Sequence, residues 1–212
     1  MVKFVSVNLN GKTEVNLELN KGEFYYLSYE KKKDKNLFLQ MLTKVTLPKK
    51  GTIIIGGEDF TASPDSGCKV IMRKLGITYE DHKFISYKTI FENLKYYLNL
   101  RRYTDEEAIK LSVEVLKFFR LFHKKDDFIE NLTQEEIHYF SLARALSTEP
   151  SYLVMEEFHK GLDDTNTKKV FLLLEEFCKN GLGIIYITND RTIWERYPKD
   201  LNMLGEGVIK NV

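Results

Sequence analysis

Two short apolar runs near the end of the chain, separated by one amphipathic segment, restrict the fold more than any other feature. Residues 152–155 and 183–188 carry no charged side chain, and their length and composition are typical of strands buried on both faces. Between them, residues 165–179 place apolar side chains at helical spacing. A strand, a helix and a second strand in this order favour parallel strands and an α/β fold.

Further strands are predicted within the first 60 residues. Apolar and polar side chains alternate over residues 15–19, as in a strand with one buried face. Two more strands are predicted at residues 24–27 and 51–57 because apolar runs there are bordered by glycine turns. Residues 35–45 predict a helix between them, with Val45 on its apolar face.

The middle of the chain changes to a helical pattern after a short apolar stretch at residues 75–79. Helices are predicted over residues 88–100, 105–122 and 134–147. The second of these has a continuous apolar stripe made of Ala108, Leu111, Val115, Phe118, Phe119 and Phe122. The chain is therefore expected to carry a helical subdomain inserted into an α/β core, and to end in a hairpin near Gly205 and Gly207.

Composition excludes several classes of protein. The 212 residues have a net charge of +1, which gives no electrostatic reason to expect nucleic acid as a partner. No apolar run approaches the roughly 18 residues of a membrane span, and the first residues alternate like a strand instead of forming a signal peptide. Cys68 and Cys178 do not have metal-ligand spacing and are interpreted as packing residues. These absences predict a cytoplasmic protein.

Several segments together resemble a known family, the ATP-binding cassettes of ABC transporters. They follow one another in the family's order and spacing: residues 76–82 (Gly-Ile-Thr-Tyr-Glu-Asp-His), 89–93 (Thr-Ile-Phe-Glu-Asn), 142–146 (Leu-Ala-Arg-Ala-Leu), 161–164 (Gly-Leu-Asp-Asp) and 174–177 (Leu-Glu-Glu-Phe). The resemblance is strongest to the FtsE type, which works in cell division beside the membrane protein FtsX. It implies a P-loop NTPase-like core with a mostly parallel sheet and an antiparallel β subdomain at the N-terminal side. It also implies one domain over residues 1–212, with a core of about 1–80 and 148–212 and a helical insert of about 81–147.

By this resemblance, ATP and Mg²⁺ are the implied cofactors, and residues 29–36 correspond to the phosphate loop. Lys35 matches the lysine of the G-x-x-x-x-G-K-[ST] pattern, but Tyr29 and Asp34 replace both glycines. Asn36 replaces the hydroxyl that ligates Mg²⁺. Glycines let backbone N–H groups curl around phosphates. The segment is therefore either a residual anion site built on Lys35 or a solvated basic loop that caps a helix.

Four more positions correspond to the family's catalytic and metal-binding residues. Glu80 replaces the glutamine that senses Mg²⁺, and Glu156 replaces the aspartate that ligates it. Glu157 matches the general base, and Asn189, 32 residues later, replaces the switch histidine. Acids at the end of a buried parallel strand lie where a ligand crevice is expected. The alternative is that Glu80 and Asn189 are ordinary polar residues at strand ends.

The family's signature segment is altered as well. Thr133 keeps a hydroxyl, whereas Gln134 and Glu135 take the places of the two glycines whose backbone would meet the γ-phosphate bound by a second cassette. Glu135 would bring negative charge toward a negative ligand. Thr133 and Glu136 also fit a helix-capping box, T-x-x-E, which is the simpler interpretation.

These substitutions predict a cassette with absent or very weak ATP hydrolysis, because removing one preorganised contact typically slows catalysis by about 10²–10³. The leading hypothesis is an FtsE-like pseudo-ATPase that docks on an FtsX-like integral membrane protein, at the cytoplasmic face of the inner membrane. Residues 80–84, Tyr87 and Tyr96–Tyr97 are expected to line the docking groove, or else to be ordinary core. A homodimer or a heterodimer with another cassette is compatible with the resemblance. The alternative is an ATP-hydrolysing ABC subunit with non-standard ligands.

Overall fold

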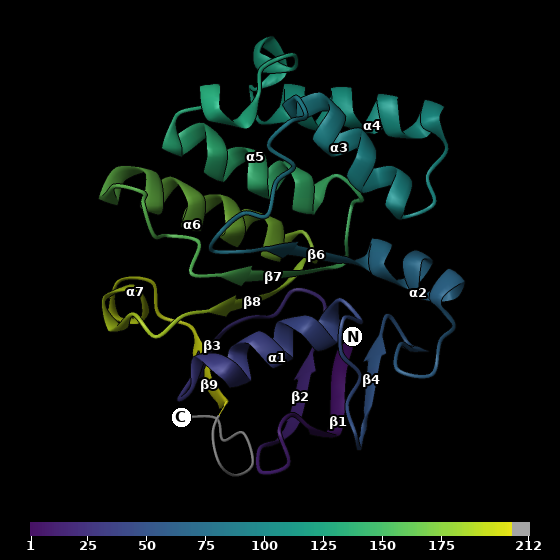
Figure 1. Cartoon of the computed structure of the whole chain (residues 1–212). Coiled ribbons are helices and arrows are strands. Elements are labelled where there is room, and N and C mark those ends of the chain that lie inside the picture. Colours follow the sequence, from purple (N-terminus) through teal and green to yellow (C-terminus); the bar gives the residue numbers. More distant parts are fainter. Residues whose placement is uncertain (205–212) are drawn as a thin grey trace.

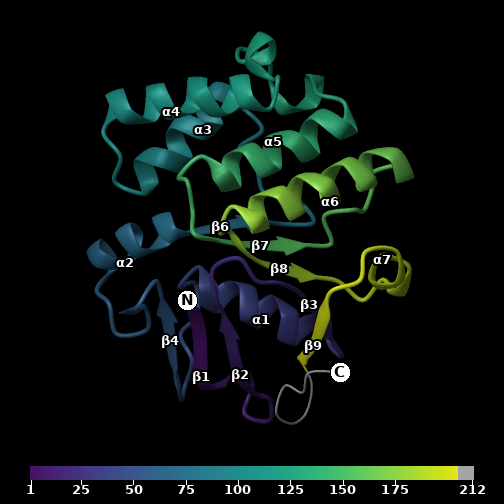
Figure 2. The same ribbon diagram turned by 180° about the vertical axis from the view of Figure 1, so that it is seen from behind.

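The computed structural model describes residues 1–204, which form two sheets and several layers of helices (Figures 1 and 2). The strands are β1 (Val2–Asn8), β2 (Glu14–Leu19), β3 (Phe24–Tyr29), β4 (Thr52–Ile55), β5 (Glu58–Asp59), β6 (Leu75–Thr78), β7 (Tyr152–Glu156), β8 (Gly183–Ile187) and β9 (Asp200–Leu204). The helices are α1 (Lys32–Leu42), α2 (Asp65–Ile71), α3 (Ile90–Leu100), α4 (Asp105–Phe118), α5 (Gln134–Leu146), α6 (Asp164–Lys179) and α7 (Arg191–Arg196). Short 3₁₀ turns span Met72–Lys74, Phe122–Lys124 and Ile129–Asn131.

The larger sheet is parallel and has the strand order β6-β7-β8-β3-β9. The smaller sheet is antiparallel, has the order β2-β1-β4-β5, and lies at the N-terminal side of the fold. The predicted α/β class with a mostly parallel sheet, an antiparallel β part and helices is therefore confirmed. The adjacent strands β7 and β8 are the two apolar runs from which the parallel sheet was predicted.

The two faces of the parallel sheet bury different cores, as the alternation along β7 illustrates. Tyr152 and Val154 point to a core shared with α1 and the antiparallel sheet. Leu153 and Met155 point to the opposite core, which they share with α5 and α6 (Figure 1). Because strand side chains alternate, Glu156 shares the face of Tyr152 and Val154 and is directed toward α1.

Between β6 and β7 the chain forms α3, α4 and α5, which pack on one another around a third, smaller apolar cluster. Each of these helices begins with a complete capping box, made of Thr89 with Glu92, Thr104 with Glu107, and Thr133 with Glu136. In each box, side chains satisfy two backbone N–H groups that a helix N-terminus would otherwise leave unpaired. The capping box predicted at Thr133 is therefore confirmed. Within residues 1–204, no helix is both long and apolar enough to cross a bilayer.

Three details of the prediction were wrong or cannot be compared. The helix predicted at 35–45 starts at Lys32 and ends at Leu42, so Val45 lies beyond it with its side chain 73% exposed. The helix predicted over residues 105–122 ends at Phe118, and its buried residues are Ala108, Ser112 and Leu116. The predicted apolar stripe is therefore only partly buried, and Phe118 is 61% exposed. The hairpin predicted near residues 205–207 falls outside the described residues.

Candidate functional site

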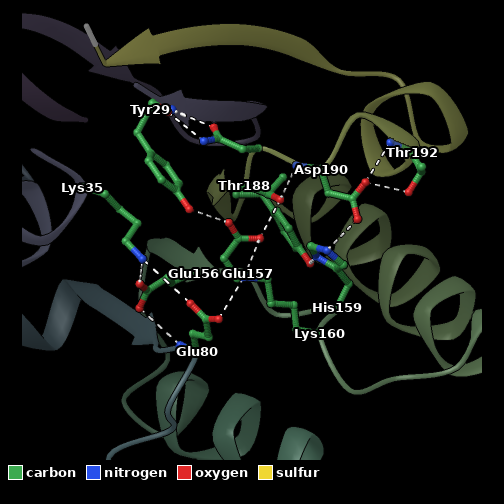
Figure 3. A network of polar contacts seen from close by, with 12 residues as sticks. Tyr29, Lys35, Glu80, Glu156, Glu157, His159, Lys160, Thr188, Asp190 and Thr192 are labelled. Atoms are coloured by element: carbon green, nitrogen blue, oxygen red, sulfur yellow. Dashed lines mark hydrogen bonds and ion pairs between the residues drawn. The ribbon is translucent and has the colours of Figure 1, made fainter. Parts of the chain in front are cut away.

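Polar side chains converge at the carboxyl ends of the parallel strands β3, β7 and β8, at the place where an open α/β sheet has its ligand crevice (Figure 3). Most other side chains of these strands are apolar and buried. The polar residues at their carboxyl ends therefore lie together at this edge of the sheet. The crevice is thus built from Tyr29 at the end of β3, Glu156 and Glu157 at the end of β7, and the segment that follows β8.

Lys35 lies on the first turns of α1 and points its ammonium group into this edge. The side chain is only 5% exposed, and its ammonium forms an ion pair with the buried carboxylate of Glu156. The second carboxylate near it is that of Glu80, whose Oε2 lies 3.9 Å from Nζ of Lys35. The ring of Tyr29 covers the ammonium at 5.2 Å from the ring centroid. The charge of Lys35 is therefore already balanced by groups of the chain itself.

The connection from β3 to α1 is very short, since only Glu30 and Lys31 separate the strand from the helix. The N–H of Glu30 donates to Leu204, and those of Asp34 and Lys35 donate to the carbonyl of Lys31. Within residues 1–204, none of the positive φ angles falls in this segment. A nest of backbone N–H groups around an anion requires left-handed residues, so this turn does not form one. Because α1 starts at Lys32, three residues earlier than predicted, these residues are helical instead of forming a phosphate-binding loop.

Asp34 does not face the crevice as a phosphate-loop residue would. Its carboxylate is buried and accepts a hydrogen bond of 2.6 Å from Nδ2 of Asn10. The side chain of Asn10 also accepts bonds from the N–H groups of Lys12 and Thr13. Asp34 thus fastens the β1–β2 turn to α1, which is a structural role.

The carboxylate of Glu157 is buried and held by two hydroxyl donors. The hydroxyl of Tyr29 donates to its Oε1 at 2.9 Å, and that of Thr188 donates to its Oε2 at 2.8 Å. Burial and the hydrogen bond to Glu157 raise the pKa of the Tyr29 phenol far above its usual value, so this hydroxyl remains a donor. Glu157 has a φ of 45°, which is rare for a residue with a side chain. In this strained backbone conformation, the carboxylate of Glu157 reaches both hydroxyls.

Glu80 and Lys160 extend the cluster outward. Nζ of Lys160 donates to Oε1 of Glu80 at 2.9 Å and lies 3.8 Å from Oε2 of Glu157. The backbone N–H of Glu80 also donates to Glu156 at 3.2 Å. The hydrogen bond between Lys160 and Glu80 raises the pKa of the lysine and lowers that of the carboxyl, so each keeps the other charged.

Asn189 uses its amide to join β8 to β3. Its Oδ1 accepts from the N–H of Tyr29 at 2.9 Å, and its Nδ2 donates to the carbonyl of Tyr29 at 2.7 Å. Both polar atoms of the amide are thereby used on the backbone. Beside it, Nε2 of His159 pairs with Asp190 at 3.2 Å, and burial lowers the pKa of His159.

Thr133 and Glu135 stand apart from this edge, at the start of α5. The hydroxyl of Thr133 accepts from the N–H of Glu136 at 3.2 Å, as the capping box requires. The link to the crevice is indirect and runs through His138, whose ring nitrogens lie 2.7 Å from the carbonyl of Gln134 and 2.9 Å from that of Lys160. The first turn of α5 is thus connected to Lys160.

A cavity of about 500 Å³ lies next to the cluster, between α1 and the segment after β6. It is lined by Asn36, Tyr79, Glu80 and Glu156, among others. In the described part of the chain, no three His, Cys, Asp or Glu side chains have a geometry that could hold a metal ion. Of the three positions considered for Mg²⁺, Glu80 and Glu156 are paired with lysines, and Asn36 is at the cavity wall.

The order of these positions along the chain can be compared with known families. The sequence model of the ABC transporter family matches residues 13–159, which contain the β3–α1 turn, Glu80, the start of α5 and the end of β7. The chain belongs to the ABC transporter family. Its fold agrees: a dimeric ATP-binding cassette in a post-hydrolysis state, bound to ADP and Pi, superposes with a TM-score of 0.82 over 100% of this chain and 97% of that one, at 22% identity. A second neighbour, cbiO1 of Clostridium perfringens, part of the ABC transporter complex cbiONQ, gives 0.79 over 99% and 86%, also at 22% identity.

Two curated relatives of this ABC cassette are similar to about the same degree. The cell division ATP-binding protein FtsE of Bacillus subtilis is 26% identical over 201 residues, which are 95% of this chain and 87% of FtsE. The methionine import ATP-binding protein MetN 2 of Acinetobacter baylyi is 27% identical over 217 residues, or 98% of this chain and 64% of MetN 2. The chain thus spans less than two thirds of that relative's length.

In this structure, the groups at the positions that the family uses for Mg²⁺-ATP are engaged with one another. The ammonium of Lys35 is paired with Glu156, the ring of Tyr29 lies over it, and the β3–α1 turn has no left-handed residue to form an anion nest. A triphosphate brought to this edge would meet the carboxylates of Glu80, Glu156 and Glu157. No chemical step through a bound nucleotide follows from this arrangement.

The sequence motifs did not single out Lys160, Thr188 or His159, although all three belong to the site. Thr188 is the first polar residue after the apolar strand β8, and that position was the available signal. Lys160 lies three residues after Glu157 in a turn, and nothing in its spacing indicates that the side chain folds back over the strand end.

Proposed function

We propose that this ABC cassette acts without hydrolysing ATP, as an FtsE-like pseudo-ATPase subunit that docks on an FtsX-like integral membrane protein. The observation that carries the proposal is the buried ion pair between Lys35 and Glu156. The lysine expected to meet phosphates already has a carboxylate partner, and breaking a buried pair leaves an unpaired charge at a cost of about 3–5 kcal/mol. A nucleotide would have to offset this cost while meeting three carboxylates.

The docking part of the proposal draws on two exposed aromatic side chains of the helical part. Tyr87 is 78% exposed, and Tyr96 on α3 is also exposed, so both rings are available to a partner surface. Phe84, by contrast, packs against Phe140, and Tyr97 stacks under Arg101, so these two belong to the interior of the helical part. We place the partner against Tyr87, Tyr96 and the cavity wall, with the cassette at the cytoplasmic face of the inner membrane.

Two further elements complete the proposal. We divide residues 1–212 into a core of about 1–80 and 148–212 and a helical insert of about 81–147, and the insert carries Tyr87 and Tyr96. A pair of cassettes, identical or not, would be the assembled form. A role in cell division or envelope remodelling rests on the similarity to FtsE, whereas the similarity to MetN 2 supports an import system equally well.

The alternative is an ATP-binding and ATP-hydrolysing ABC subunit with non-standard ligands. It is favoured by the retention of Lys35 and of Glu157 at the positions that the family uses. Under this alternative, the cluster would open when nucleotide arrives, and Glu157 would be the general base.

Calorimetric titration of the purified chain with ATP, with and without Mg²⁺, separates the two functions. The pseudo-ATPase should show no saturable binding below about 1 mM. A ligand present at 100 times its Kd would stabilise the fold by about 2.7 kcal/mol, so unfolding in 5 mM ATP provides a second readout. Binding in the micromolar range together with Mg²⁺-dependent phosphate release would establish the alternative instead.

Docking is tested by co-purification of the tagged chain with an FtsX-like protein from membranes. The variant Tyr87→Ser should lose the membrane protein from the purified complex. Leu172→Ser, which changes an exposed apolar side chain on α6, is the matched control and should keep it. Equal recovery with both variants would show that Tyr87 is not at the interface.

A further inference from the structure

Three carboxylates meet at the edge of the parallel sheet, and we call Glu80, Glu156 and Glu157 the carboxylate cluster. Glu156 and Glu157 are both buried, whereas Glu80 is half exposed. Like charges this close raise one another's energy, so a cluster of this kind needs cations to remain ionised. Tyr29 and Thr188 supply hydrogen bonds to Glu157 but no charge.

Two lysines alternate with the three carboxylates in a continuous row (Figure 3). In order, Glu156 pairs with Lys35, Lys35 approaches Glu80, Glu80 binds Lys160, and Lys160 approaches Glu157. Lys160 is thus the cation that joins Glu80 to the buried Glu157 at one end of the row. Three carboxylates against two ammonium groups leave one negative charge, and loss of Lys160 would leave two.

The backbone around Lys160 is fixed in a way that keeps its side chain over the cluster. Its N–H donates to the carbonyl of Glu157 at 3.0 Å, which turns the chain back toward the strand end. Its carbonyl lies 2.9 Å from Nε2 of the buried His138, which anchors the turn to α5. The next residue, Gly161, has a φ of +86°, a backbone conformation that residues with side chains rarely adopt. The position of Lys160 is therefore built into the turn.

We infer that Lys160 is the built-in cation of the carboxylate cluster and takes the electrostatic role that a divalent metal ion would have at this edge of the sheet. Oxygen atoms of carboxylates are the ligands that Mg²⁺ and Mn²⁺ prefer, and the ammonium group neutralises them instead. The cluster then needs neither metal nor nucleotide to stay ordered. This inference rests on the proposed nucleotide-independent function and gives it a physical basis.

The test is a gain of metal binding. With Lys160 in place, no three His, Cys, Asp or Glu side chains of the described residues have a geometry that could hold a metal ion. Lys160→Met removes the charge, keeps most of the side-chain volume and releases the half-exposed carboxylate of Glu80. The cluster should then be able to rearrange and acquire affinity for a divalent cation. Loss of the free Mn²⁺ signal in electron paramagnetic resonance measures this directly, without nucleotide. We expect the variant to bind one Mn²⁺ at least 10-fold more tightly than the unmodified chain. Lys168→Met, an exposed charge-matched control on α6, should behave like the unmodified chain.

Two companion variants keep the inference open to refutation. The double variant Lys160→Met with Glu80→Gln should lose the gained Mn²⁺ site, because one carboxylate is removed. Lys160→Gln serves if the methionine variant does not fold, since glutamine can still donate to Glu80 but carries no charge. A folded Lys160→Met or Lys160→Gln variant that binds Mn²⁺ no better than the Lys168→Met control would overturn the inference.

The Mn²⁺ measurement on Lys160→Met and the ATP titration of the unmodified chain test two separate claims. Micromolar ATP binding by the unmodified chain would remove the proposed function, whatever Lys160→Met does with Mn²⁺. Conversely, a variant without Mn²⁺ affinity would remove the role assigned to Lys160 while the unmodified chain could still fail to bind ATP.

Discussion

At the scale of single residues, Tyr29 makes contacts in the crevice that a glycine could not make. It stands where the family has a glycine, and its hydroxyl and ring serve two neighbours, the carboxylate of Glu157 and the ammonium of Lys35. Its backbone N–H and carbonyl are both bound by Asn189. One substitution therefore supplies a hydrogen-bond donor and an apolar cover, whereas the link to Asn189 uses backbone atoms that any residue would offer.

The hydroxyl of Tyr29 can be tested separately from its ring. Tyr29→Phe leaves the ring over Lys35 but removes one of the two hydroxyl donors to the buried carboxylate of Glu157. We expect the free energy of unfolding to fall by about 1–3 kcal/mol, measured by urea denaturation. Tyr87→Phe, which removes an exposed hydroxyl, should change it by less than about 0.5 kcal/mol. Equal effects would mean that the bond to Glu157 contributes nothing.

His82 provides a prediction about pH. Burial, followed by the nearby His138 and Arg144, lowers its pKa to about 4. Between this value and the ordinary histidine pKa of 6.5, the unfolded chain binds a proton that the folded chain does not, so stability rises with pH across this window. In His82→Gln, this contribution disappears. Because the ring is partly exposed, the effect is reduced. The rise in the free energy of unfolding between pH 4 and 6.5 should be smaller in His82→Gln than in the unmodified chain by about 1–2 kcal/mol.

Urea midpoints at pH 4.5, 5.5 and 7 for His82→Gln and the unmodified chain measure the difference. His123→Gln, at an exposed histidine, is the control and should follow the unmodified chain. Parallel pH profiles for His82→Gln and the unmodified chain would contradict the assignment.

At the scale of elements, the starts of two helices show which features could be predicted from the sequence and which could not. The capping box at Thr133 was predicted from the T-x-x-E spacing, because capping depends on residues that are neighbours along the chain. The start of α1 was predicted three residues too late, since the phosphate-loop pattern imposed a loop on residues 29–34. Without the glycines, residues 32–34 adopt the helical conformation that their side chains favour.

Thr133 allows the capping role to be separated from a ligand-binding role. Thr133→Ala should lower the free energy of unfolding by about 1 kcal/mol and leave any binding of ATP unchanged. Thr104→Ala removes the equivalent cap of α4 and should cause a loss of similar size. If Thr133→Ala alone altered ATP affinity in calorimetry, Thr133 would be a nucleotide contact and not only a cap.

At the scale of the whole molecule, the three cores differ in how strongly they hold their elements. The two cores on the faces of the parallel sheet are large, whereas the cluster under α3 and α4 is small. The apolar strands could be read from periodicity, because burial on both faces leaves a continuous apolar run. Their order in the sheets could not, because it depends on pairing between distant segments. The row of charges from Glu156 to Glu157 could not be read from the sequence either, because its members come from three separate segments and meet only through the fold.

The difference between cores predicts unequal local stability. Backbone amides of α3 and α4 should exchange hydrogen through a partial opening of lower free energy than those of β7 and β8. Hydrogen exchange followed by mass spectrometry at increasing urea concentrations measures both. Equal protection of α4 and β8 would indicate that the whole chain opens as one unit.

The mutual pairing of Lys35 and Glu156 also has an evolutionary consequence. Lys35 already has the family's usual residue, so a reversion is possible only at Glu156 or at Tyr29. Glu156→Asp would shorten one partner of the buried pair, and Tyr29→Gly would uncover it. Complete loss of one partner would cost about 3–5 kcal/mol, a large share of the 5–15 kcal/mol that keeps a typical domain folded. Substitutions at Glu156, Lys35 and Tyr29 are therefore expected to be tolerated more readily together than singly.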